Sequence, residues 1–434
     1  MEKRDFKYSQ VYLHFKKLIE EETLKQGDKM PSLISCTKEL LVSKTTVENA
    51  YFQLAADGYI ISKERSGYYV TGKKKGAGAT ELKAVAISDK RKNTDKVYDM
   101  SNVGDDPTAF RFDLWQRYMK SAIRHKDRMA TYGESQGETE LRQEIAAYVR
   151  KRRNIYCTAD NIVIGASTQN LLGILIPLLK ENGKKTASVP AKGFDRYAHV
   201  FKSYNFDVNI RDKESDVIYV SPSHMTLWGD VMSLSRRYEI LEHSKKGHTI
   251  IEDDYQNEFN FSKQVRPSIY ALAGGENIVY LGSFSRLLLP SIRISFMILP
   301  KELLESYRMV AGLYDQTASK TEQLALASYL RDEHLQRQIK KLRKIYLGKR
   351  ELLHSILNKL IKDIPGLLLS AGECGTEMLV HGNAEQIKKL NEKLEEYKIS
   401  ARKVNRYFDS YEDSLMFSCG FISVNDLVEL DAKL

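Results

Sequence analysis

Short apolar runs alternate with stretches of helical spacing from Tyr98 onward, and this alternation limits the folds that the chain can adopt. Such an order is typical of an α/β domain, in which ligands bind at the carboxyl ends of the strands of a sheet. From about Pro300 the chain becomes helical and then mixed, which predicts a smaller α+β C-terminal subdomain. The predicted strands are 162–164, 217–220, 249–251 and 279–281, and the helical stretches include 170–179 and 233–243.

The first seventy residues predict a different structure, with three short helices followed by a β-hairpin. Apolar residues recur at helical spacing from Val11, Ser32 suits the start of a second helix, and Ser43 suits the start of a third. Two β-rich runs, 59–61 and 68–70, flank a basic tip. Three helices and such a hairpin indicate a winged helix-turn-helix.

The start of the third helix and the hairpin tip are the expected contacts to DNA. A helix N-terminus offers amides and hydroxyls to a phosphate or a base edge, and Arg65 at the tip can reach a neighbouring groove. The candidate DNA-binding residues are Ser32, Ser43, Lys44, Thr45, Thr46, Arg65, Ser66 and Gly67.

A segment rich in glycine and lysine separates the two parts of the chain. Residues 73–97 have little to bury, so we expect a flexible basic linker there. The predicted domains are therefore a DNA-binding domain over 1–72 and a larger domain over 98–434.

Composition excludes several classes of protein. The 434 residues carry 67 Lys and Arg against 57 Asp and Glu, and the formal charge of +10 is compatible with binding to a polyanion. The four cysteines are far apart and form no CxxC pair, which argues against a zinc site and a disulfide framework. No apolar run reaches the roughly 18 residues of a membrane span, and the N-terminus resembles no signal peptide, so we expect a cytoplasmic protein.

The N-terminal part contains Gly27, Pro31-Ser32 and the run 42–47, followed by Ala50-Tyr51 and the run 67–70. In these residues it resembles the GntR family of DNA-binding domains. Two positions depart from the family pattern, because Ile34 and Lys44 stand where arginines are usual. A lysine is a point charge without the two-pronged geometry of a guanidinium, so the base preference is the property most affected.

Four segments of the larger part carry a further resemblance, namely 132–142, 165–172, 250–259 and 280–286. In these segments it resembles MocR/GabR-type regulators, whose second domain is similar to fold-type-I aminotransferases. The resemblance implies a site for pyridoxal phosphate in which Asp253 pairs with the ring nitrogen and Tyr255 donates to the ring oxygen. It implies phosphate contacts from the hydroxyls of Ser167, Thr168, Ser283 and Ser285 and from the guanidinium of Arg293, with Tyr132 contributing from a partner subunit. It also implies that the ring of Phe194 stacks on the cofactor. The candidate cofactor-binding residues are Tyr132, Ser167, Thr168, Phe194, Asp253, Tyr255, Ser283, Ser285, Arg286 and Arg293.

Arg286 stands where this family has the lysine that holds the cofactor. A guanidinium stays protonated and forms no imine, so we expect no catalytic residue at this position and no aminotransferase activity. The loop 222–229 also departs from the family pattern. Pyridoxal phosphate could then bind only noncovalently, or not at all.

These observations favour a DNA-binding transcriptional regulator of MocR type. We expect a homodimer on double-stranded DNA, no membrane contact, and an aminotransferase-like domain that senses a small anionic ligand or a vitamer. Two alternatives stay open. One is a pyridoxal-phosphate-dependent aminotransferase, which Arg286 opposes. The other is a DNA-binding dimer that responds to no ligand.

Overall fold

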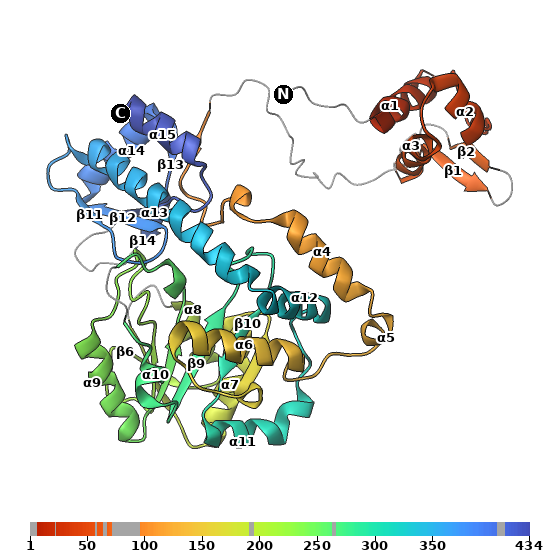
Figure 1. Cartoon of the computed structure of the whole chain (residues 1–434). Coiled ribbons are helices and arrows are strands. Elements are labelled where there is room, and N and C mark those ends of the chain that lie inside the picture. The colour runs from red at the N-terminus through yellow and green to blue at the C-terminus, as the bar shows by residue number, and fades with distance from the viewer. Residues whose placement is uncertain are drawn as a thin grey trace. The chain divides into compact units, whose positions relative to one another are not determined.

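The computed structural model describes residues 7–21, 23–56, 59–63, 67–71, 96–190, 195–262, 266–405 and 413–434. The chain divides into two compact units, Met1–Asn93 and Thr94–Leu434, and each is described by itself (Figure 1). Three of the predicted contact residues, Arg65, Ser66 and Phe194, lie outside the described residues, as does the linker segment 72–95.

The N-terminal unit is a winged helix-turn-helix, as predicted. Its elements are α1 (Lys7–Glu20), α2 (Leu33–Leu40), α3 (Lys44–Ala56), β1 (Ile60–Lys63) and β2 (Gly67–Val70). The two strands pair antiparallel, with Ile60 opposite Val70. Val11, Phe15 and Val47 are buried in a core that the helices and the hairpin share, so the apolar spacing in the sequence marks the inward faces.

The larger unit is built on a sheet in the order β4-β10-β9-β8-β7-β5-β6. All neighbours pair parallel except β10, which is antiparallel to both β4 and β9. The strands are β4 (Ile162–Gly165), β5 (Thr186–Val189), β6 (Asp207–Ile210), β7 (Val217–Val220), β8 (Thr249–Asp253), β9 (Ile278–Ser283) and β10 (Ser295–Ile298).

Helices cover both faces of this sheet because alternate residues of the buried strands face opposite sides. Ile218 and Ile250 pack with the first group of helices, whereas Val217 and Ile251 pack with the second. The first group is α4 (Phe112–Ile123), α6 (Thr139–Arg153), α9 (Leu234–Lys245), α10 (Ile269–Ala273) and α12 (Lys320–Arg331). The second is α7 (Thr168–Glu181), α8 (Asp195–Ser203) and α11 (Lys301–Val310). Short helical turns are α5 (Lys126–Met129), η1 (Pro107–Ala109), η2 (Ala159–Asn161), η3 (Asn257–Phe259) and η4 (Ala311–Leu313).

The C-terminal α+β subdomain is also present as predicted. The long helix α13 (His334–Ile361) leads into an antiparallel sheet of order β11-β12-β15-β14, and β13 pairs with β3 from the start of the unit. The remaining elements are β3 (Tyr98–Asp99), β11 (Leu368–Ser370), β12 (Glu377–Gly382), α14 (Ala384–Glu396), β13 (Ile399–Ser400), β14 (Arg402–Asn405), β15 (Asp413–Ser418) and α15 (Val424–Lys433).

Strand register brings the predicted site residues to one edge of the large sheet. Ser295 on β10 lies opposite both Gly165 and Ser283, and Asp253 ends β8 opposite Leu281. The residues after these strand ends therefore face the same side of the molecule, where the subdomain also contributes side chains. Among the described residues, no helix is long and apolar enough to cross a membrane.

Candidate functional site

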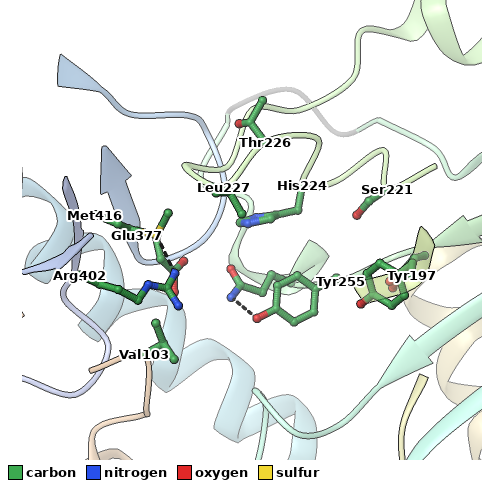
Figure 2. Close-up of a pocket in the computed structure, with 12 residues that line it drawn as sticks. Val103, Tyr197, Ser221, His224, Thr226, Leu227, Tyr255, Glu377, Arg402 and Met416 are labelled. Carbon is green, nitrogen blue, oxygen red and sulfur yellow. Dashed lines mark hydrogen bonds between the residues drawn. The ribbon is translucent and has the colours of Figure 1, made fainter. Parts of the chain in front are cut away.

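A cavity of about 210 Å³ lies at the carboxyl ends of β7 and β8, and the subdomain closes its other side (Figure 2). Figure 2 shows His224, Tyr255 and Tyr197 around it, with Glu377 and Arg402 facing them from β12 and β14. Its lining is Val103, Tyr197, Ser221, His224, Thr226, Leu227, Asp253, Tyr255, Gln256, Glu377, Arg402 and Met416.

Asp253 is one of two buried carboxylates in the lining of this cavity, with 5% of its surface exposed, and Glu377 is the other. It accepts a hydrogen bond from the hydroxyl of Tyr219, whose ring stacks on Tyr197 at a centroid distance of 4.8 Å. Burial raises the pKa of Asp253 to about 6, although the Tyr219 hydroxyl acts in the opposite direction. The side chain can therefore change its charge near neutral pH.

The two acidic neighbours of Asp253 have structural partners instead. Glu252 accepts hydrogen bonds from the backbone amides of Ile269 and Tyr270, at 2.9 and 2.8 Å, and so caps the start of α10. Asp254 pairs with Arg153, with 2.6 Å between the carboxylate oxygen and Nε. Of the three consecutive acids, Asp253 is the one that lines the cavity.

Arg286 is buried in an ion-pair network behind the cavity wall. Its guanidinium lies 3.0 Å from the Asp105 carboxylate and 3.4 Å from that of Glu377. It also donates to the carbonyl of Val103 at 2.5 Å and to the hydroxyl of Thr376 at 2.8 Å. Burial lowers the pKa of Arg286, but Tyr255 and the two carboxylates outweigh it, so the pKa rises and the cation is permanent. The side chain ties the large sheet to the subdomain.

The polar groups near Arg286 leave hydrogen-bonding capacity inside the site. Burial lowers the pKa of His224 to about 4, so its ring is neutral at pH 7, and it packs edge-to-face on Tyr255 at 5.3 Å. Within the described part of the chain, the buried atoms His224 Nδ1, Gln256 Oε1 and Asp105 Oδ2 have no hydrogen-bond partner. Buried polar groups are normally satisfied, so these atoms fit a site that takes a polar ligand or ordered water.

The predicted phosphate contacts are not part of the lining of this cavity. Ser167 caps α7 by accepting from the Asn170 amide at 3.1 Å, and Thr168 is the first residue of that helix. Ser283 and Ser285 share a hydrogen bond of 3.3 Å at the end of β9. Arg293 is exposed in the β9–β10 connection, and Tyr132 is fully exposed.

Sequence reasoning missed several lining residues, including Tyr197, His224, Glu377 and Arg402. His224 lies in the loop 222–229, and an imidazole in a loop after a strand is a usable signal. Tyr197 lies in α8, which no expectation from the sequence covered. Glu377 and Arg402 come from the subdomain, where nothing in the local spacing points to the sheet edge.

In the N-terminal unit, four of the predicted contact residues, Ser43, Lys44, Thr45 and Thr46, lie at the start of α3. Ser43 accepts from the Thr46 amide at 3.2 Å and thereby caps the helix, while Thr45 is exposed. Lys44 has 65% of its side chain exposed and pairs with Glu48 at 3.7 Å. Ser32 caps α2 in the same way, and Gly67 begins β2 with a φ of +105°.

Comparison with known proteins agrees with this two-part architecture. Residues 7–70 match the bacterial regulatory proteins of the gntR family, and residues 104–419 match aminotransferase class I and II. The chain is 32% identical over 362 residues to the uncharacterized HTH-type transcriptional regulator YdeL of Bacillus subtilis, covering 80% of this chain and 78% of that protein. The chain belongs to this family of HTH-type transcriptional regulators with an aminotransferase-like domain.

More distant relatives and solved structures extend the same picture. The pyridoxine biosynthesis regulator PdxR of Corynebacterium glutamicum is 25% identical, over 81% of this chain and 79% of its own length. The probable rhizopine catabolism regulatory protein MocR of Rhizobium meliloti is 23% identical, over 86% of this chain and 81% of its own length. An archaeal alanine:glyoxylate aminotransferase superposes with a TM-score of 0.66 at 18% identity, covering 78% of this chain and 90% of that one, and supports the fold.

An aminotransferase-like fold implies pyridoxal-phosphate binding in the family, and the cavity fits part of that cofactor. Asp253 is a buried carboxylate that could hold a protonated ring nitrogen, and Tyr255 lies beside it. Arg286 does not fit the covalent link, because its guanidinium forms no imine and is engaged with Asp105 and Glu377.

Proposed function

We propose that this chain is a DNA-binding regulator whose aminotransferase-like unit holds a small ligand noncovalently and catalyses no transamination. The observation that carries the proposal is the state of Arg286. The cation at this position is buried and paired with the carboxylates of Asp105 and Glu377. A catalytic amine, in contrast, would have to be free to attack an aldehyde. A side chain used in this way serves the structure of the unit.

The ligand suited to the first cavity is small and polar. The volume of this cavity at Asp253, about 210 Å³, is below the roughly 300 Å³ at which pockets for drug-sized molecules begin. Asp253 offers a carboxylate to a ring nitrogen or an amine, and Arg402 offers a guanidinium to a phosphate or carboxylate. Pyridoxal phosphate, a vitamer adduct or another small anion would meet these groups. Binding would bias the arrangement of two winged helices in a homodimer on a repeated or inverted DNA site.

DNA binding is tested with the full chain and a labelled fragment from upstream of its own gene. We expect saturable fluorescence anisotropy without any added ligand. Lys44→Ala should weaken binding, whereas Lys17→Ala is a matched control, because Lys17 is an exposed α1 lysine that also pairs with a glutamate at 3.7 Å. Equal effects of the two substitutions would contradict a specific role for the start of α3.

Ligand binding is tested by adding pyridoxal phosphate and related vitamers and following the visible spectrum and the thermal midpoint. We expect a rise in midpoint that Asp253→Asn reduces. A shift in neither signal would remove the cofactor part of the proposal and leave the DNA-binding part standing. Recovery of a transamination product from the purified chain would overturn the absence of catalysis.

A further inference from the structure

A second cavity, of about 360 Å³, lies on the α9 face of the large sheet, near the edge strand β6. Its size falls within the range of small-molecule sites, which starts at roughly 300 Å³. The lining residues are Ser188, Pro190, Arg211, Asp212, Lys213, Ile218, Tyr219, Val220, Met225, Thr226, Met232, Arg236, Ile240 and His243.

The floor of this second cavity is apolar. Ile218 and Val220 point from β7 toward α9, which contributes Ile240, and Met225 and Met232 complete the surface. Two methionines let such a surface adapt to the shape of an apolar group, since their side chains are unbranched and flexible. The floor therefore suits an alkyl chain or an aromatic ring.

The rim carries an excess of one positive charge. Lys213 and Arg236 share Glu239 as their partner, and Asp212 is satisfied by Ser215 Oγ at 2.6 Å. The cations counted here are Arg211, Lys213 and Arg236, and the carboxylates are Asp212 and Glu239. Arg211 is therefore the cation of the rim without a carboxylate partner among the described residues.

Arg211 is held in place at the mouth of the second cavity. It adopts a left-handed backbone conformation, with φ of +54°, which costs a residue with a side chain roughly 1–2 kcal/mol. Its amide donates to the Val189 carbonyl at 2.9 Å, and its Nε donates to the Pro190 carbonyl at 2.8 Å. Among the described residues, the terminal guanidinium nitrogens have no hydrogen-bond partner, and neither does the buried Nδ1 of His243.

We infer that the second cavity binds a small monocarboxylic acid with an apolar body. The carboxylate pairs with the guanidinium of Arg211, His243 supplies a further hydrogen bond, and the apolar body lies on Ile218, Val220 and Ile240. Thr226 lines both cavities, so the bound acid contacts the loop 222–229, which also lines the first cavity. This site is separate from the proposed cofactor position at Asp253 and does not depend on it.

The test is calorimetric titration of the full chain with octanoate, octan-1-ol and acetate. Octanoate should bind more tightly than octan-1-ol, which lacks the charge, and acetate, which lacks the apolar body. Arg211→Gln should reduce octanoate affinity at least tenfold and leave octan-1-ol unchanged. Ile240→Phe, which fills the floor, should weaken both eight-carbon ligands.

Two arginine control variants test whether octanoate binds at Arg211 or at another arginine. Arg402→Gln alters the first cavity and Arg152→Gln an exposed position in α6, so neither should change octanoate affinity. Equal binding of octanoate and octan-1-ol would refute the carboxylate part. Unchanged affinity in Arg211→Gln, or a loss in Arg402→Gln instead, would refute the site. Because Arg211 is exposed, its substitution should not prevent folding.

Discussion

Replacement of Arg286 by glutamine is expected to destabilise the unit Thr94–Leu434 by about 3–5 kcal/mol. The side chains of Asp105 and Glu377 are only 6% and 8% exposed, so loss of the guanidinium leaves two carboxylates buried without a cation. Burial raises the pKa of Asp105 even though Arg286 lies beside it and acts in the opposite direction.

Urea unfolding followed by circular dichroism measures this effect. With a slope of about 3 kcal/mol per molar urea, the midpoint of the unit should fall by about 1 M or more. Arg286→Lys keeps a cation and should lose less than half as much. The loss in Arg286→Gln should shrink as the pH falls toward 4, because the two carboxylates then become neutral. A midpoint within experimental error of wild type at pH 7 would refute the buried ion-pair network.

Three further substitutions probe other parts of the account. The pKa of Asp253 is raised from an ordinary 3.8 to about 6, so this carboxyl reduces the stability of the fold increasingly as the pH rises between those values. Asp253→Asn should therefore increase the free energy of unfolding by up to about 3 kcal/mol at pH 7 and by little at pH 4, as measured by urea unfolding. A gain that does not depend on pH would contradict this. Lys44→Ala should reduce the slope of log affinity for DNA against log salt by about 1, and an unchanged slope would mean that Lys44 meets no phosphate. Gly229 has a φ of +89°, and a Cβ there would lie 1.8 Å from the Cys374 carbonyl oxygen. Gly229→Ala should therefore destabilise the larger unit by more than about 1 kcal/mol in thermal unfolding. A variant as stable as the wild type would show that this contact is not tight.

Local patterns in the sequence were sufficient for the strands β4, β7, β8 and β9 of the large sheet and for the helices α7 and α9. The apolar run 249–251 becomes β8, and the run 217–220 becomes β7, because buried parallel strands are continuous apolar segments. The reversed direction of β10 and the position of β5 and β6 at the sheet edge depend on pairing between distant segments. Such pairings leave no trace in local spacing.

The candidate site shows the same division. The position of Asp253 at a strand end was readable, and the alternation of side chains along a strand explains why Glu252 and Asp254 point elsewhere. The partners of Arg286 could not be predicted from the sequence, because Asp105 lies about 180 residues before it and Glu377 lies 91 residues after it along the chain. The chemistry of a guanidinium indicated that Arg286 cannot form an imine. Only the folded structure shows that Arg286 pairs with Asp105 and Glu377.

We propose that the cation at position 286 is structural and that the aminotransferase-like unit acts as a receptor for the DNA-binding unit. The most direct test is to incubate the full chain with pyridoxal phosphate, reduce with borohydride, and determine the intact mass with peptide mapping of residues 280–300. We predict an unmodified mass for wild type under conditions in which an active aminotransferase is fully labelled. A stoichiometric pyridoxyl adduct on any side chain of the chain would contradict the account.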